Sequence, residues 1–277
     1  MHQTHQHEMK LIISILALCA FLPSNVFADS FISSSEYDWN GFYAGIIAGA
    51  VSSSLQTNYD VELSGTSSET ESRNWNFDTT DTARNQTLGA GVLMGYNWQS
   101  DLLLIGIEAD QSFSNTSLTS KSEINLSQSL SSHRDMTNSV GQAKLLYNLD
   151  WTGTVRGRIG LAAENLMVYG TGGIAYGHVS GSAHATANWY DYRVADTTKR
   201  EGLNVGWVAG CGIEYGAKTL SLGIEFVHLQ FRPVHFNWNV FSEVAGKQQY
   251  ENVINAKVSG AIDNSIGIVR TTLKWHF

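Results

Sequence analysis

Apolar and polar side chains alternate along several long stretches of the chain, and the clearest of these stretches is the last one. Val269, Thr271, Leu273, Trp275 and Phe277 alternate there with Arg270, Thr272, Lys274 and His276. Because successive side chains of a β-strand point to opposite faces, this segment has one apolar and one polar face. We therefore predict a membrane strand with its apolar face toward lipid and its polar face toward a lumen.

A segment near residue 90 has the same alternation. One face carries Leu88, Ala90, Val92, Met94, Tyr96 and Trp98, and the other carries Gly89, Gly91, Leu93, Gly95, Asn97 and Gln99. The first face is apolar, whereas the second is small or polar. This pattern predicts a second strand between lipid and a lumen.

The alternation predicts eight strands, each long enough to cross a membrane, since a tilted strand needs about 9 to 11 residues to do so. They cover residues 39–51, 87–99, 102–113, 151–162, 166–179, 203–215, 219–231 and 262–277. Three connections are short turns, at 100–101, 163–165 and 216–218. The other four, 52–86, 114–150, 180–202 and 232–261, are rich in Ser, Thr, Asn and Asp and are predicted to be surface loops.

The expected fold class is all-β: an eight-stranded antiparallel transmembrane β-barrel with four long extracellular loops. An even strand number with short periplasmic turns and long outer loops is typical of outer-membrane barrels, and it leaves both termini in the periplasm. The barrel must close, because an open sheet edge in hydrocarbon would leave backbone groups without partners. Aromatic residues near the strand ends predict a periplasmic girdle of Tyr96, Trp98, Tyr215, Trp275 and Phe277, and an outer girdle of Phe113, Trp151, Tyr176 and Trp207.

The beginning of the chain has the organisation of a signal peptide. A short basic region at Met9-Lys10 is followed by the apolar run Leu11 to Leu22 and by Val26-Phe27-Ala28. We interpret residues 1–28 as the signal, 29–38 as a periplasmic tail and 39–277 as the barrel. The residues before Met9 contain three histidines, and we interpret them as an upstream start or leader extension rather than a metal-binding tract. No later apolar run is long enough for a membrane helix.

Composition agrees with an exported barrel. Charged residues make up 15% of the chain, below the usual quarter, and there are 26 glycines but only two prolines. The net charge of -8 and the lack of a basic stripe argue against a nucleic-acid partner. Because Cys19 lies in the signal, Cys211 alone remains and no intramolecular disulfide is expected.

Charged residues occur on the faces predicted to point inward. This set contains Glu108, Arg156, Arg158, Glu214, Glu225, Arg270 and Lys274. We expect them to form cross-strand salt bridges, because buried charges without partners are costly. An eight-stranded barrel is just wide enough for side chains to fill it, so we expect a plugged lumen. The alternative is a charge ring that lines a narrow, porin-like ion path.

Several segments together resemble a known family. They are Trp39-Asn40-Gly41-Phe42-Tyr43-Ala44-Gly45, WTGTVRGRIG at 151–160, VYGTGGIAYG at 168–177, GWVAGCGIEY at 206–215 and the terminal LKWHF. The chain resembles the outer membrane immunogenic protein family, a group of porin-like surface barrels related in fold to opacity proteins and to the transmembrane domain of OmpA. This resemblance implies a surface antigen with a structural barrel. The long loops depart most from the family pattern, so any function borne by the loops is the least transferable.

Signals for catalysis or ligand binding are few. His178-Val179-Ser180, with Asp191 and Glu201 nearby, resembles the His-x-Ser arrangement of a lipid A deacylase, but such short matches are common and the surrounding sequence does not resemble that enzyme. His178, His184, His228 and His235 fall near the outer ends of the fifth and seventh predicted strands or in the loops beyond them, and they are candidate haem ligands, because haem iron takes axial histidine and some relatives within this broad family are regarded as haem-binding.

The sequence therefore predicts a non-enzymatic outer-membrane surface barrel without a cofactor, whose loops contact host surface or matrix molecules. A narrow diffusion pore and a haem-binding receptor are the alternatives. The expected partners are outer-membrane lipids, lipopolysaccharide and the barrel assembly machinery. The assembly signal is expected in the terminal strand, at Trp275 and Phe277.

Overall fold

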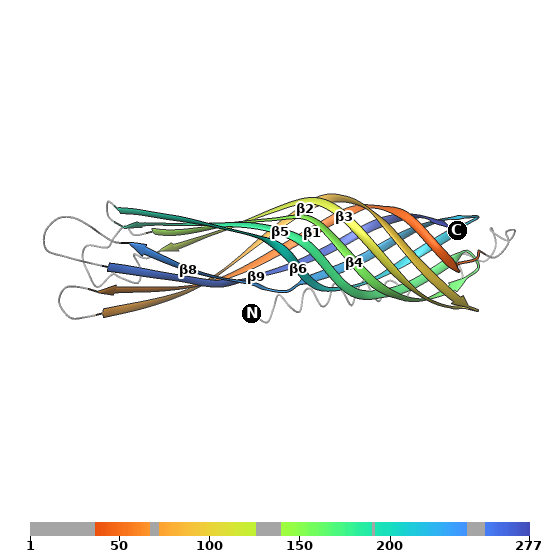
Figure 1. Ribbon diagram of the computed structural model, residues 1–277, viewed down its shortest axis with the longest axis horizontal. Helices are drawn as coiled ribbons and strands as arrows, with labels where there is room; N and C mark the ends of the chain where they lie inside the picture. The colour runs from red at the N-terminus through yellow and green to blue at the C-terminus, as the bar shows by residue number, and fades with distance from the viewer. Residues whose placement is uncertain (1–36, 67–71, 126–139, 190–191, 243–252) are drawn as a thin grey trace.

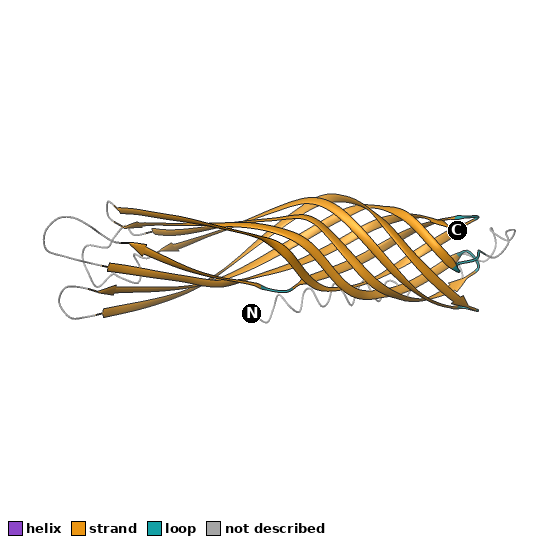
Figure 2. Ribbon diagram, viewed as in Figure 1, coloured by secondary structure: helices purple, strands orange, loops and turns teal. Residues whose placement is uncertain are grey.

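The structure is a computed structural model that describes residues 37–66, 72–125, 140–189, 192–242 and 253–277. The regular structure in these ranges consists of β-strands (Figure 2). None of the described residues belongs to a helix that is long and apolar enough to span a membrane. The expected signal peptide, and the tail up to residue 36, lie outside the described residues.

The strands form one antiparallel sheet that closes on itself (Figure 1). In chain order they are β1 (Gly41–Thr66), β2 (Ser72–Ser100), β3 (Leu103–Asn125), β4 (Val140–Ala163), β5 (Leu166–Trp189), β6 (Tyr192–Ala217), β7 (Leu220–Phe231), β8 (Val234–Ser242) and β9 (Val253–His276). Each strand pairs with its neighbour in sequence up to β7, β7 pairs with β9, and β9 pairs with β1. The β1–β9 ladder closes the barrel, as predicted.

β7 and β8 together form one interrupted strand of the barrel. Both pair with β9, β7 through Leu220–Gln230 and β8 through Val234–Ser242. The interruption falls at Arg232 and Pro233, and a proline has no N–H to donate to a ladder. The closed barrel therefore has eight strands, which confirms the predicted fold class.

Three two-residue turns connect the strands at one end of the barrel. They lie at 101–102, 164–165 and 218–219, shifted by about one residue from the predicted positions. The first residue of each turn has a left-handed backbone, with φ of 50° at Asp101, 49° at Glu164 and 58° at Lys218. A side chain in this conformation costs energy, so these turns store a small amount of strain.

The half of the barrel next to these turns has an apolar outer surface. Phe42, Ile46, Leu88, Met94, Ile105, Ile159, Ile174 and Leu222 are all exposed on it. The predicted periplasmic girdle residues Trp98, Tyr215, Trp275 and Phe277 are exposed near the turns, and the outer girdle residues Phe113 and Trp207 are exposed farther along. This apolar band between two aromatic belts is the surface that a bilayer requires.

The strands continue far beyond the outer belt, which corrects the predicted loop boundaries. β1 has 26 residues and β2 has 29, more than twice the roughly 11 that a crossing needs. Much of 52–86, 114–150, 180–202 and 232–261 is therefore strand rather than loop. The Ser- and Thr-rich composition was misleading, because threonine suits a pleated strand well and only a few inward leucines mark the buried face.

β4 contains one extra residue at the level of the outer belt. In the ladder with β5, Leu149 pairs with Val179 and Trp151 pairs with His178, so Asp150 is the extra residue. The register with β3 also shifts at this level, between Phe113 and Thr116. Below this bulge the buried residues of β4 are even-numbered, such as Thr152 and Thr154, whereas above it they are odd-numbered, such as Tyr147. A β-bulge reverses the alternation in this way.

Beyond the outer belt the barrel divides into two sheets, which diverge at the left of Figure 1. The β2–β3 ladder covers only Ala90–Ser100, and the β6–β7 ladder covers only Gly206–Ala217. In contrast, the β1–β2 and β5–β6 ladders continue to the outermost described residues. The outer segments of β8, β9, β1 and β2 thus form one sheet, and those of β3, β4, β5 and β6 form the other.

Candidate functional site: the filled lumen

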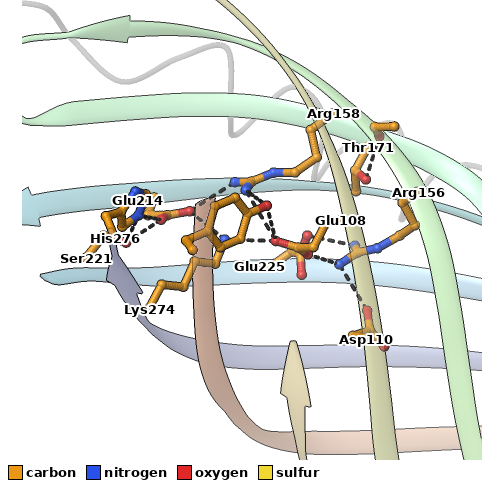
Figure 3. A network of polar contacts seen from close by, with 12 residues as sticks. Glu108, Asp110, Arg156, Arg158, Thr171, Glu214, Ser221, Glu225, Lys274 and His276 are labelled. Atoms are coloured by element: carbon orange, nitrogen blue, oxygen red, sulfur yellow. Dashed lines mark hydrogen bonds and ion pairs between the residues drawn. The ribbon is translucent and has the colours of Figure 1, made fainter. Parts of the chain in front are cut away.

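Register places the charged residues of the lumen at similar heights on different strands. Glu108 of β3 pairs directly with Arg156 of β4, and Glu225 of β7 pairs directly with Arg270 of β9. Glu214 lies on β6 and Lys274 lies near the end of β9. The strand alternation turns these side chains inward, where Figure 3 shows them converging.

The structure brings all seven predicted lumen residues into one network and adds Asp110 to it. Four acids face four bases: Glu108, Asp110, Glu214 and Glu225 against Arg156, Arg158, Arg270 and Lys274. Their formal charges cancel. Every one of the eight residues is at most 5% exposed, so each depends on its partners rather than on bulk water.

Glu108 is the centre of the network. One of its carboxylate oxygens is paired with Arg156. The other lies 3.2 Å from Arg158 Nη1 and 3.0 Å from Lys274 Nζ, and it accepts a hydrogen bond from the Tyr43 hydroxyl at 2.9 Å. One acid thus accepts hydrogen bonds from three cations of two different strands, β4 and β9, and a fourth cation, Arg270 of β9, lies 3.9 Å away.

The other acids extend the network toward both ends of the barrel. Glu214 lies 3.0 Å from Arg158 Nη2 and 2.8 Å from Lys274 Nζ. At the opposite side Glu225 accepts hydrogen bonds from Arg156 Nη1 at 2.8 Å and from Arg270 Nε at 2.7 Å. Asp110 lies 3.0 Å from Arg270 and also accepts a hydrogen bond from Thr154 at 2.7 Å. Five strands are joined through these contacts.

Two buried tyrosines pack against the cations. The guanidinium carbon of Arg158 lies 3.9 Å from the ring centre of Tyr169, and Lys274 Nζ lies 4.9 Å from that of Tyr43. Such contacts are attractive because the ring face is electronegative. Both rings lie against inward glycines, Tyr43 against Gly95 and Tyr169 against Gly212, where a Cβ would collide with the ring. Glycine therefore provides the space that the tyrosines occupy.

The N-terminal segment before β1 closes the end of the lumen nearest the turns. Tyr37 is 4% exposed and Trp39 is fully buried, and their rings meet edge-on at 4.5 Å. Trp39 Nε1 donates a hydrogen bond to the carbonyl oxygen of Glu164 in the β4–β5 turn at 3.3 Å. Residues 37–39, which were expected to end the tail and begin the first strand, instead form a plug inside the barrel mouth.

The plug is joined to the charged network through His276. This ring stacks on Tyr43 and meets Tyr37 edge-on. Its Nε2 lies 3.1 Å from the hydroxyl oxygen of Ser221, which in turn donates a hydrogen bond to Glu214. The plug and the network thus form one continuous interior.

An apolar cluster fills the lumen on the other side of the network. Its buried members include Val51, Leu55, Leu118, Leu145, Tyr147, Leu149, Leu229, Phe231, Ile262 and Ile266. They come from both outer sheets, so the cluster holds the two sheets together where they begin to diverge. The lumen therefore contains three layers in series: the aromatic plug, the charged network and the apolar cluster.

The four histidines considered as haem ligands do not share one location. His178 of β5 pairs with Leu203, whereas His228 of β7 pairs with Ala209, so the two lie about 20 Å apart along β6. His184 is farther out on β5, and His235 is on β8. His178 and His228 are therefore too far apart to ligate one haem iron together. Within the described ranges, no group of three or more His, Cys, Asp or Glu side chains could hold a metal ion.

His178 has two acidic neighbours on the outer surface. Its Nδ1 lies 3.0 Å from Asp150 and its Nε2 lies 3.1 Å from Glu201, and its ring stacks on Trp151. Ser180 is directly opposite Glu201 in the β5–β6 ladder. Because carboxylates contact both ring nitrogens of His178, neither nitrogen is positioned as a base for Ser180. Asp191 lies outside the described residues.

The terminal strand is part of the closing seam. Trp275 pairs with Ala44 of β1 and with Leu220 of β7, and its side chain is exposed on the apolar band. The Phe277 N–H donates a hydrogen bond to the Phe42 carbonyl oxygen at 2.9 Å, and the Phe277 side chain is 80% exposed. The two proposed assembly-signal residues thus face outward at the periplasmic belt.

Sequence reasoning missed several members of the site. Asp110 could have been found, because it is two residues from Glu108 and so shares its face. Tyr43 and Tyr169 also have the inward parity of their strands, but parity alone does not identify them as partners of the cations. The plug formed by Tyr37 and Trp39 has no signal in the alternation, because it precedes the first strand.

No protein-family model matches the chain. It is 28% identical over 287 residues to the 31 kDa outer-membrane immunogenic protein of Brucella melitensis, an alignment that covers 97% of this chain and 100% of that protein. A 22 kDa outer membrane protein of Rhizobium leguminosarum is 29% identical over 127 residues, covering 46% of this chain and 44% of the relative. Among solved structures, the outer membrane protein OprG of Pseudomonas aeruginosa matches with a TM-score of 0.39 and 12% identity, over 86% of this chain and 97% of that one.

Proposed function

This chain is an outer-membrane β-barrel related over nearly its whole length to the outer-membrane immunogenic proteins, and we propose that it is a non-conducting, non-enzymatic surface protein that binds host surface or matrix molecules. In this proposal the membrane half is an anchor with a sealed interior. The two outer sheets and their connections carry the binding surface.

The filled lumen is the observation that carries the proposal. Trp39, Arg156, Arg158, Phe231 and Lys274 are among the largest fully buried side chains, and all of them lie inside the barrel. An ion would have to pass the aromatic plug, break balanced salt bridges and then cross an apolar cluster. A conducting barrel needs a continuous polar path, which three such layers in series oppose.

The length of the strands supports a role outside the cell. The ladders of β1 with β2 and of β5 with β6 continue well past the outer aromatic belt. A protein that only spanned the membrane would not need strands of 24 to 29 residues. The extended sheets hold surface connections away from the lipid, where they can reach other molecules.

Planar-bilayer recording tests the sealed lumen. We expect purified, folded protein to give no steady conductance, whereas Trp39→Ala with Tyr37→Ala should give small, flickering openings because the plug is lost. Steady conductance of the unmodified barrel, altered by Arg156→Ala, would overturn this part of the proposal. Slower migration after heating in SDS gels checks that every variant has folded.

Binding assays with shortened hairpins test the surface role. Because Thr57 pairs with Asp81 and Ser120 pairs with Leu145, residues 58–80 or 121–144 can each be replaced by Asn-Gly without changing the remaining register. We expect cells that display the full protein to adhere to immobilised matrix proteins, and at least one shortened variant to lose most of that adhesion. Equal adhesion of cells with and without the protein would refute the surface role.

A further inference from the structure

Dividing the barrel into two sheets leaves four strand edges above the membrane. They are the outer segments of β2 (72–89), β3 (114–125) and β6 (192–205), together with β8 (234–242). A strand edge presents backbone N–H and C=O groups that can pair with another chain. The four edges differ in how they are protected against pairing with another chain.

Side chains bridge the seam between β2 and β3. The Asp81 carboxylate of β2 accepts hydrogen bonds from the Ser120 hydroxyl at 2.6 Å and from the Lys121 N–H at 3.0 Å. Asn85 Nδ2 donates to the Ser117 carbonyl oxygen at 2.8 Å. These bonds satisfy backbone groups of the β3 edge and hold the two edges together without a ladder.

Hydrogen bonds join the base of the seam between β6 and β8. The Arg232 N–H donates to the Val205 carbonyl oxygen at 3.1 Å, and Asn204 Nδ2 donates to the Arg232 carbonyl oxygen at 3.0 Å. Pro233 then interrupts the strand, and β8 continues by pairing with β9. Beyond this point no β6–β8 ladder is formed among the described residues.

The two edges of this seam carry very different charge. The outer segment of β6 contains Arg193, Asp196, Lys199, Arg200 and Glu201, whereas β8, with the sequence VHFNWNVFS, contains no Asp, Glu, Lys or Arg. Charged residues on an edge strand are a common protection against unwanted pairing. β6 has this protection, and β8 lacks it.

We propose that the free edge of β8 pairs with β8 of a second copy in the same membrane. An edge without charges is complementary to itself, because no like charges meet when two copies approach. The barrel holds β8 at a fixed height above the bilayer, so the edges of neighbouring copies lie level with each other. The outer segment of β6 would bring Lys199 and Arg200 against the same residues of the other copy, which disfavours pairing there.

Membrane orientation fixes the direction of this pairing. Two copies inserted in the same sense are related by a two-fold axis along the membrane normal, so their β8 strands both run outward. The pairing is therefore parallel, with each residue near its own counterpart. Antiparallel pairing would require barrels in two facing membranes.

Thiol crosslinking in proteoliposomes tests the interface. In a Cys211→Ala background, single cysteines are placed at Asn237, Asn239 or Ser242 in β8 and, as matched controls, at Thr197 or Thr198 in β6. A short bis-maleimide should link the β8 variants into dimers at all three positions and should link the β6 variants at least tenfold less. Yields that do not change on dilution of the vesicles show that both copies share one membrane.

Charge insertion provides the second measurement. Asn237→Lys with Asn239→Lys should reduce crosslinking at Ser242 about tenfold, because two added charges meet their copies across the edge, whereas Thr197→Lys with Thr198→Lys should not. Heat-modified gel migration confirms that both double variants fold. Crosslinking that is unaffected by the β8 lysines, crosslinks at only one central position, or dimers that form only between vesicles would each overturn the proposal. Capture of an added extended peptide in place of a second copy would also overturn it.

Discussion

The membrane half of the lumen is filled by charged side chains, whereas the outer half is filled by aliphatic and aromatic ones. In the charged region, centred on Glu108, each group needs particular partners at particular distances. In the apolar region, around Leu118 and Leu145, a side chain needs only to fill its volume. The same barrel thus contains one interior that depends on pairing and one that depends on packing.

The two regions should also differ in which substitutions they tolerate. Removing one partner from a buried ion network leaves an uncompensated charge, which is more costly than the cavity left by a methyl group. We therefore expect the charged region to be sensitive to chemistry at constant size, and the apolar region to be sensitive to size at constant chemistry.

The largest effect is expected from Glu108→Ala. This change leaves Arg156, Arg158 and Lys274 each without one of their acids, and we expect it to lower the free energy of unfolding by about 4 kcal/mol. Urea titration of protein folded into liposomes, followed by tryptophan fluorescence, measures the change. Ile107→Ala, on the lipid-facing neighbour, is the control. Equal losses of unfolding free energy for the two variants would contradict the claim that the charged region depends on the ion pairs of Glu108.

Leu118→Ala should have the next largest effect, a loss of about 3 kcal/mol, because it opens a cavity in the apolar cluster. Leu118→Met conserves the volume and should cost less than about 1.5 kcal/mol. Glu108→Gln also conserves size, but it should remain costly because the charge is lost. The same titration compares the three variants. If Glu108→Gln lowered the free energy of unfolding as little as Leu118→Met does, the charged region would not depend on pairing.

A balanced deletion sharpens the comparison further. Arg270→Leu alone removes one of the two cations that contact Glu225, leaves the network with one excess acid and should cost about 3 kcal/mol, whereas Arg270→Leu combined with Glu225→Leu leaves three acids facing three bases. We expect the double variant to be more stable than the single variant by about 1 to 2 kcal/mol. A double-mutant cycle with Glu225→Leu measures this coupling. Additive losses would show that the two residues act independently.

The smallest effect is expected outside both regions. Lys218 has a left-handed backbone in the β6–β7 turn, so Lys218→Gly should stabilise the barrel by about 1 kcal/mol. Lys218→Ala removes the same charge but keeps the Cβ, and it should give no gain. The same urea titration measures both variants. An increase in the free energy of unfolding for Lys218→Ala would show that the effect comes from the lost charge rather than from the backbone conformation.

The membrane half was largely predictable from the sequence, because alternation alone assigns each residue to lipid or lumen there. The direct pairing of Glu108 with Arg156 and of Glu225 with Arg270 follows from counting along strands that start at short turns. The outer half was not predictable in the same way, since both faces of its strands are rich in polar residues. Leu55 and Leu118 lie inward there, but isolated leucines do not define a period.

Other features depend on contacts between distant segments. Trp39 meets the turn at Glu164, 125 positions away, and no local pattern specifies that contact. The division into two sheets depends on which strands stop pairing. Which strands stop pairing depends on interruptions such as Pro233 and on side chains such as that of Asp81, which hydrogen-bonds across a seam. Neither effect can be identified until it is known which strands are neighbours.

The extra residue at Asp150 keeps both parts of β4 in the correct orientation. Because a strand alternates with period two, a regular strand that contained Asp150 without a bulge would turn Leu145, Tyr147 and Leu149 toward water and Lys144 toward the apolar cluster. The bulge takes up this one residue, so the even-numbered residues below it and the odd-numbered residues above it both point inward. The position of a single residue therefore decides which side chains of the outer part of β4 are buried.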